Sequence, residues 1–224
     1  MSFADVSSAN IVGYQAQALR DGFTFVAPNF IDVGNSDEKC DLTKFTPGGD
    51  YEANEIIVSR LNNSGRNVED YAYTVDRKGN WYWDFDGEVI GEGDVFFDAG
   101  EGFSINSYTG YSMSFAGEVF KDARTIPLRD GFTFSGNFTP VKLDLTSIIP
   151  GGDFEANEII VSRLNNSGRN IEDYAYTVDR KGNWYWDFDG EVIGEGDVFF
   201  APGEGFSVNS YKGYSITIPA LDID

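Results

Sequence analysis

The sequence contains no histidine in its 224 residues and a single cysteine, Cys40. Without histidine, a Ser-His-Asp triad, a Cys-His pair and any metal site built on imidazole are excluded. One cysteine cannot form an internal disulfide, so it gives no indication of the redox compartment. Acid/base chemistry by two carboxylates is still open. Because the Asp and Glu residues cluster at turns, where solvated loops explain them, we expect a protein that is not an enzyme.

Basic residues are also scarce, with 16 Lys and Arg against 37 Asp and Glu and a net charge of −21. This excess makes a nucleic-acid partner very unfavourable and would repel an anionic membrane surface. No run of 18 apolar residues is present, so we expect no membrane span. The same charge favours solubility and would attract divalent cations.

The first ten residues lack the positively charged and apolar regions of a signal peptide. We expect the mature form of an exported protein, extracellular or at the cell surface, and a cytoplasmic protein is the alternative. The few lysines and the Asn- and Tyr-rich composition favour export. Cys40 lies in a loop that is longer in one half of the chain, so we expect it to be incidental, with intermolecular pairing as the minor alternative.

The chain is one module written twice. Residues 69–97 are identical to residues 172–200, residues 53–67 are identical to 156–170, and LRDGFTF occurs at 19–25 and again at 128–134. The first copy is longer around residues 34–41. Any function must therefore come from one module, or from two copies side by side.

Short apolar segments separated by turn residues dominate each copy, and helical periodicity is almost absent. About eight short strands are predicted per copy, at spacings typical of a small antiparallel sandwich or barrel. Asp41 and Asp144 are expected to cap single helical turns. The sequence thus predicts an all-β protein with two tandem, near-identical antiparallel β-sandwich or barrel domains, at residues 1–115 and 116–224.

The aromatic run of each copy is the main candidate binding segment. It lies in a predicted hairpin, where alternate residues share a face. Trp81 and Trp83 therefore lie together, with Tyr82 opposite, where Tyr71 and Tyr73 are expected to join it. If the Trp face points inward these residues form the core, and if it points outward they form a stacking platform for sugar rings. The candidate binding residues are Trp81, Tyr82, Trp83, Trp184, Tyr185 and Trp186.

An acidic turn follows each aromatic run and is the best candidate for an ion site. Oxygen ligands on a turn suit Ca²⁺, although the spacing differs from an EF-hand loop. The alternative is an acidic hairpin end on an acidic protein. The candidate ligands are Asp84, Asp86, Glu88, Asp187, Asp189 and Glu191, with Ca²⁺ as the candidate ion and no certain cofactor.

The order of landmarks resembles a class of exported bacterial tandem β modules of unassigned function. They share the Gly22-Phe23-Thr24-Phe25 strand, the Trp-rich hairpin and the Pro202-Gly203-Glu204-Gly205-Phe206 segment at the start of a late strand. The first copy departs from the last motif, with Ala99 in the proline position. The resemblance implies an exported, non-enzymatic surface or structural module and brings no catalytic residues.

Two functions from different classes follow from the duplication. The leading hypothesis is an extracellular structural subunit that assembles head-to-tail into a filament or surface layer, joining residues 214–218 of one molecule to residues 9–12 of the next. Its partner is then the protein itself. The alternative is a bivalent carbohydrate-binding or adhesion protein that uses the Trp hairpin of each copy and binds a polysaccharide.

Overall fold

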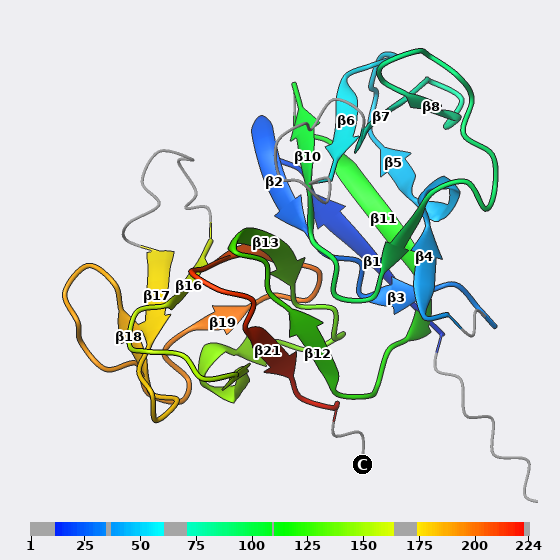
Figure 1. Cartoon of the computed structure of the whole chain (residues 1–224). Helices are drawn as coiled ribbons and strands as arrows, with labels where there is room; N and C mark the ends of the chain where they lie inside the picture. Colours follow the sequence, from blue (N-terminus) through cyan, green and yellow to red (C-terminus); the bar gives the residue numbers. More distant parts are fainter. Residues whose placement is uncertain (1–11, 35–36, 61–70, 109, 164–173, 222–224) are drawn as a thin grey trace, which may run out of the picture.

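The computed structural model describes residues 12–34, 37–60, 71–108, 110–163 and 174–221. Within these ranges the chain is all-β, with small antiparallel sheets and short 3-10 turns. Figure 1 shows the blue-to-green and green-to-red halves of the chain as two lobes. No helix in the described ranges is long and apolar enough to cross a membrane.

The first half contains a five-stranded sheet and a smaller sheet built around one long strand. The five-stranded sheet has the order β2 (Gly22–Val26), β10 (Phe103–Ser107), β6 (Ile56–Ser59), β7 (Ala72–Val75) and β8 (Trp81–Trp83). In the smaller sheet, β11 (Ser112–Val119) pairs with β1 (Val12–Ala18), β3 (Phe30–Ile31) and β5 (Thr46–Gly48). A separate ladder joins β4 (Lys39–Asp41) to β9 (Phe96–Asp98).

The second half repeats this pattern. Its five-stranded sheet has the order β13 (Gly131–Gly136), β20 (Gly205–Ser210), β16 (Ile159–Ser162), β17 (Ala175–Val178) and β18 (Trp184–Trp186). In its smaller sheet, β21 (Ser215–Ile218) lies between β12 (Arg124–Pro127) and β15 (Ile149–Gly151), and β14 (Leu143–Asp144) pairs with β19 (Phe199–Phe200). The described second half has no counterpart of β3, which precedes the longer loop of the first copy and extends the pairing of β11 to Val119.

The all-β, antiparallel prediction is confirmed, whereas the expected division into two sandwiches or barrels is less clear. The larger sheets are arranged in a propeller-like ring of 4 blades rather than as two clearly tandem sandwiches. The expected dividing position at residue 115 falls inside β11, and the first strand of the second half begins at Arg124. The first copy therefore uses residues beyond 115 to complete its smaller sheet.

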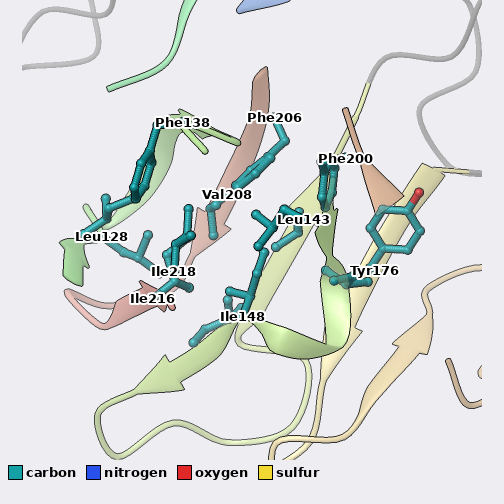
Figure 2. Close-up of a cluster of buried hydrophobic side chains, with 14 of the residues drawn as sticks. Leu128, Phe138, Leu143, Ile148, Tyr176, Phe200, Phe206, Val208, Ile216 and Ile218 are labelled. Carbon is teal, nitrogen blue, oxygen red and sulfur yellow. The ribbon is translucent and has the colours of Figure 1, made fainter. Parts of the chain in front are cut away.

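Each half has its own hydrophobic core, because the inward residues of both its sheets are apolar. Figure 2 shows the core of the second half, with the labelled residues contributed by several strands. Residues of each half also contribute to, or pack against, the core of the other half. Ile31 and Ala99 from the first half belong to the second core, and Leu221 packs against the first core. The halves are thus joined by apolar packing as well as by the chain.

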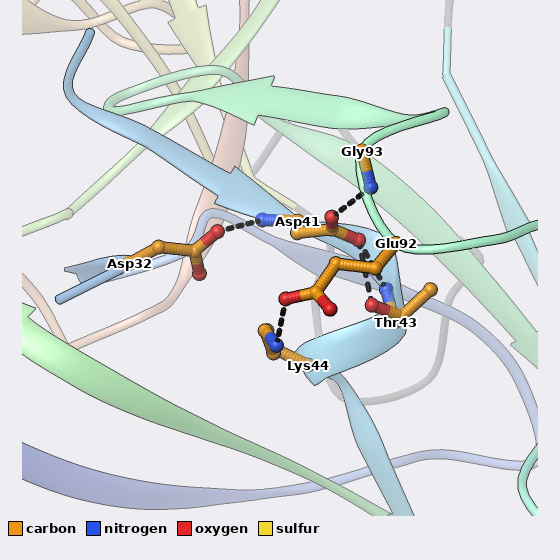
Figure 3. Close-up of polar contacts among 6 residues, drawn as sticks. All are labelled: Asp32, Asp41, Thr43, Lys44, Glu92 and Gly93. Atoms are coloured by element: carbon orange, nitrogen blue, oxygen red, sulfur yellow. Dashed lines mark hydrogen bonds and ion pairs between the residues drawn. The ribbon is translucent and has the colours of Figure 1, made fainter. Parts of the chain in front are cut away.

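A 3-10 turn fixes the loop that follows β4 (Figure 3). Asp41 caps the turn Leu42–Lys44, and one carboxylate oxygen accepts hydrogen bonds from the Thr43 N–H and hydroxyl, each at 2.8 Å. The other oxygen accepts from the Gly93 N–H at 2.6 Å, while Lys44 pairs with Glu92 at 2.6 Å. Asp144 repeats the cap in the second half. The predicted caps are therefore present, and they also anchor the loop after the Trp hairpin.

The two halves meet through residues that hold equivalent positions in the two copies. Phe25 and Phe134, the last residues of the two LRDGFTF segments, stack with ring centroids 5.1 Å apart and planes inclined by 16°. Nearby, the Gly102 N–H donates to the Phe134 carbonyl at 3.0 Å, and the Ala27 N–H donates to the Gly203 carbonyl at 3.1 Å. This contact sets the position of each half relative to the other.

Candidate functional site

The first tryptophan of each hairpin is a core residue. Trp81 and Trp184 are each 1% exposed, and their indole N–H groups donate to the carbonyls of Phe45 and Ile148 at 3.3 Å. A buried indole that has satisfied its only donor presents no ring to a ligand. Trp81 and Trp184 therefore form part of the core and are not a stacking platform for sugar rings.

The tyrosine of each run braces the hairpin turn. The hydroxyls of Tyr82 and Tyr185 donate to Asp76 and Asp179 at 3.0 Å. The expected grouping with Tyr73 is wrong. Tyr73 is paired directly with Trp83 across the ladder, so it lies on the Trp side of the sheet and is 1% exposed. The outward aromatic surface that we expected around Tyr82 therefore lacks this ring.

The second tryptophan lines an aromatic cleft, which is the best candidate site in the described residues. Trp186 lies half-buried between Tyr176, at 5.3 Å between ring centroids, and the exposed Phe188, at 5.9 Å. The cleft has a volume of about 540 Å³, within the range of small-molecule sites. The aromatic cleft is lined by Arg163, Tyr174, Tyr176, Trp186, Phe188, Asp197, Val198 and Phe199.

The cleft forms where four segments end close together. Tyr176 and Trp186 are direct partners in the β17–β18 ladder, Phe188 follows β18, Arg163 follows β16, and Phe199 begins β19. Trp186 packs against the core on one side. The hairpin thus extends beyond the edge of the core, which leaves Trp186 half-buried and Phe188 exposed to solvent, whereas Tyr176 stays buried.

Polar groups stand at one end of the cleft in fixed positions. The Arg163 guanidinium lies 5.2 Å from the Phe200 ring, donates to the Phe199 carbonyl at 3.0 Å and pairs with Glu204 at 2.6 Å. Burial raises the pKa of the Tyr176 hydroxyl above its ordinary value, against the lowering effect of Arg163. The hydroxyl therefore stays protonated at neutral pH.

The first half carries the same side chains in the same relation. Trp83 lies 5.2 Å from Tyr73 and 5.9 Å from Phe85, again measured between ring centroids. Arg60 donates to the Phe96 carbonyl at 3.0 Å and pairs with Glu101 at 2.6 Å. The corresponding residues are Arg60, Tyr71, Tyr73, Trp83, Phe85, Asp94, Val95 and Phe96. The duplication thus gives the first half the same side chains that line the aromatic cleft of the second half.

The acidic turns do not gather their carboxylates. Asp84, Asp86 and Glu88 are exposed, and Asp86 accepts a hydrogen bond from the Glu88 N–H at 2.9 Å beside Gly87 at φ 73°. Asp187, Asp189 and Glu191 repeat this arrangement. Across the described ranges, no group of three or more Asp, Glu, Cys or His side chains could hold a metal ion. Turn formation accounts for the spacing of these residues.

Cys40, expected in the longer loop of the first copy, is a core residue of β4. It is 2% exposed and pairs with Phe97 in the β4–β9 ladder. In the second half Leu143 pairs with Phe200 at the equivalent place and is 5% exposed. A free cysteine behaves as a small apolar side chain when it is buried, so the thiol substitutes here for leucine.

Sequence reasoning picked Trp83 and Trp186 and named Tyr71 and Tyr73, although on the side of Tyr82, but it missed the phenylalanine rings of the cleft. The missed rings are Phe85 and Phe188, two residues beyond the tryptophans, together with Phe96 and Phe199 from a separate strand. The sequence alone did not indicate that these phenylalanines lie beside the tryptophans, because their positions depend on the geometry of the turns. No family model matches the chain, and no curated protein matches it.

Proposed function

We propose that the protein is a non-catalytic, exported, bivalent carbohydrate-binding protein, with one binding site in the aromatic cleft of each half. The sites use Trp83 and Trp186 from the hairpins, together with Phe85 and Phe188. This retains the carbohydrate-binding hypothesis but moves the site away from Trp81, Tyr82 and their counterparts.

The arrangement of aromatic and polar groups in the cleft carries this proposal. A sugar ring presents C–H groups on its faces and hydroxyls around its rim. The negative face of an aromatic ring attracts the C–H groups, and Trp186 with Phe188 offers two such rings at one opening. Arg163 and Asp197 stand at the margin, where rim hydroxyls need hydrogen-bond partners.

Charge points to a neutral sugar. The chain carries −21, which disfavours an acidic polysaccharide. Within the cleft, Arg163 is already paired with Glu204, and Asp197 adds a further negative group. An uncharged chain meets no net repulsion in this setting.

Affinity electrophoresis or a glycan array tests the proposal with neutral polysaccharides as probes. The double variant Phe85→Ala with Phe188→Ala should lose binding, because both exposed rings are removed. Phe188 and Phe132 are each 57% exposed, so Phe23→Ala with Phe132→Ala is a matched control on a different surface. Equal loss in both double variants, or no binding by the parent, contradicts the proposal.

Self-assembly remains a second candidate, and the edge strand β1 favours it. Among the described strands β1 pairs with β11 alone, and it presents Val12 at 63% and Tyr14 at 69% exposure. An unprotected edge can accept a strand from a neighbouring molecule. Of the junction expected from the sequence, residues 9–11 lie outside the described ranges, and the other side, β21, is already paired with both β12 and β15.

Sedimentation velocity tests the assembly proposal. If β1 accepts a neighbouring strand, Val12→Lys should reduce polymers, because a charged side chain on an edge opposes pairing. Val33→Lys is the control, since Val33 has a similar exposure of 66% outside any strand. A parent protein that stays monomeric at high concentration removes this candidate.

A further inference from the structure

The contact between the two halves is reciprocal. A methyl group added at Gly102 would lie 2.5 Å from the Ser135 carbonyl oxygen, and one added at Gly205 would lie 2.5 Å from the Val26 nitrogen. Gly102 and Gly205 are equivalent residues of the two copies, as are Val26 and Ser135. In each half, therefore, this glycine packs against the residue that follows the LRDGFTF segment of the other half.

Reciprocal contacts of this kind define an approximate two-fold axis. A residue touches its own equivalent only near such an axis, and Phe25 stacks on Phe134 there. A methyl group added at Gly136 would also lie 2.6 Å from the Cβ of Ala27, its equivalent residue. A head-to-tail arrangement of the two copies would instead bring non-equivalent surfaces together. The internal interface is thus isologous and closed.

The aromatic clefts are tied to this axis through their arginines. Arg60 pairs with Glu101, which stands next to Gly102, and Arg163 pairs with Glu204, which stands next to Gly205. Burial raises the pKa of Glu101 above its ordinary value, and Arg60 opposes this rise. The side chains of both ion pairs are only 21–24% exposed. The orientation of one cleft relative to the other is therefore set by the interface.

We propose that the protein cross-links two separate glycan chains instead of binding one chain at both sites. This inference rests on the proposed carbohydrate-binding function. A glycan chain has two chemically different ends and therefore a direction. A two-fold rotation carries the first cleft onto the second and carries the bound chain with it. If the chain lies across the axis, the rotation reverses its direction.

A straight chain cannot satisfy both clefts under this symmetry. Where it crosses the axis, it would enter one cleft in the correct direction and the other reversed. If the glycan chain instead runs parallel to the two-fold axis, the two clefts lie on opposite sides of that axis. A single straight chain then reaches only one of them. Two separate chains, each in the correct direction for its own cleft, satisfy both clefts equally. The protein then joins the two glycan chains that its clefts bind.

Light scattering with full-length protein tests this cross-linking. Hydroxyethyl cellulose, galactomannan, xylan and laminarin serve as polymer probes, and short oligosaccharides of each serve as probes that occupy one cleft. The parent should raise the scattering of a polymer that it binds, and excess oligosaccharide should abolish the rise. Phe85→Ala and Phe188→Ala should each still bind the immobilised polymer but lose cross-linking, whereas Phe23→Ala and Phe132→Ala should keep it.

Two results would overturn the inference. In the first, single-cleft variants cross-link as well as the parent. In the second, the parent binds the polymer far more tightly than either single-cleft variant without raising its scattering, as one chain held at both sites would do. If no oligosaccharide binds at all, the carbohydrate-binding function fails as well, so the two failures are distinguishable.

Discussion

Phe25 and Phe134 stack on each other across the boundary between the two halves, with ring centroids 5.1 Å apart. They are equivalent residues of the duplicated sequence, and each is only partly exposed. Their contact distinguishes a two-fold arrangement of the halves from a head-to-tail one. It therefore bears on how the two aromatic clefts can be used.

The Phe25–Phe134 stack should couple the stability of the two halves. Replacing either ring with alanine should destabilise the protein, and the double variant should cost less than the sum of the single changes. The coupling should be about 0.5–1.5 kcal/mol, as for other aromatic pairs. Urea unfolding of the four proteins of the double-mutant cycle measures it. Strict additivity would mean that the rings do not interact in solution.

Because Gly102 and Gly205 are closely packed against the other half, a side chain at either position should lower the stability of the protein. Gly102→Ala or Gly205→Ala should each cost about 1–3 kcal/mol, because the added methyl group meets backbone atoms of the other half. Gly110→Ala and Gly213→Ala are controls, since the added group there finds its nearest neighbour at 3.4 and 3.6 Å. Thermal unfolding compares the four variants. Equal melting temperatures for the two pairs would argue against the close interface.

The Cys40 thiol should be inert in the folded protein. Burial, and then the negative charges of Asp32 and Asp41, raise the pKa of this thiol well above its ordinary value. A thiol-reactive disulfide reagent at pH 8 should label Cys40 only after denaturant is added. Cys40→Leu should change the unfolding free energy by less than about 1.5 kcal/mol, because Leu143 occupies the equivalent position. Rapid labelling of the native protein would place Cys40 at the surface.

The hairpin turns should resist acid to an unusually low pH. Hydrogen bonds, first from the Asn80 side chain, hold the pKa of Asp76 at about 2, and Asn183 does the same for Asp179. Because the folded pKa is depressed, the stabilisation is present above the unfolded value near 4 and is lost as the pH falls through about 2. Carbon-detected NMR titration measures this directly. Asn80→Ala should raise the Asp76 midpoint towards 4, and a parent midpoint near 4 would contradict the assignment.

Sequence reasoning could predict features that depend on local rules. Short apolar segments separated by turn residues predict strands, and the aromatic run is predicted to lie in a hairpin; that hairpin is present between β7 and β8. Asp41 was predicted as a cap because its neighbours fit a single helical turn. Each of these features is decided by residues a few positions apart.

The face assigned to Tyr73 could not be predicted in this way. The Asp76 N–H bonds to the Asn80 carbonyl, and this pairing aligns Val75 with Trp81 and Tyr73 with Trp83. One residue of difference in the turn would have placed Tyr73 on the opposite face. The Phe25–Phe134 contact was hidden for another reason: it depends on how two complete modules pack together.

Isothermal titration with a short neutral oligosaccharide tests the central claim most directly. The parent should bind two molecules per chain, and Phe85→Ala and Phe188→Ala should each leave one site at unchanged affinity. The double variant should bind none. A single site per chain in the parent, or a binding curve unaffected by these changes, would contradict the assignment of the two aromatic clefts as the binding sites.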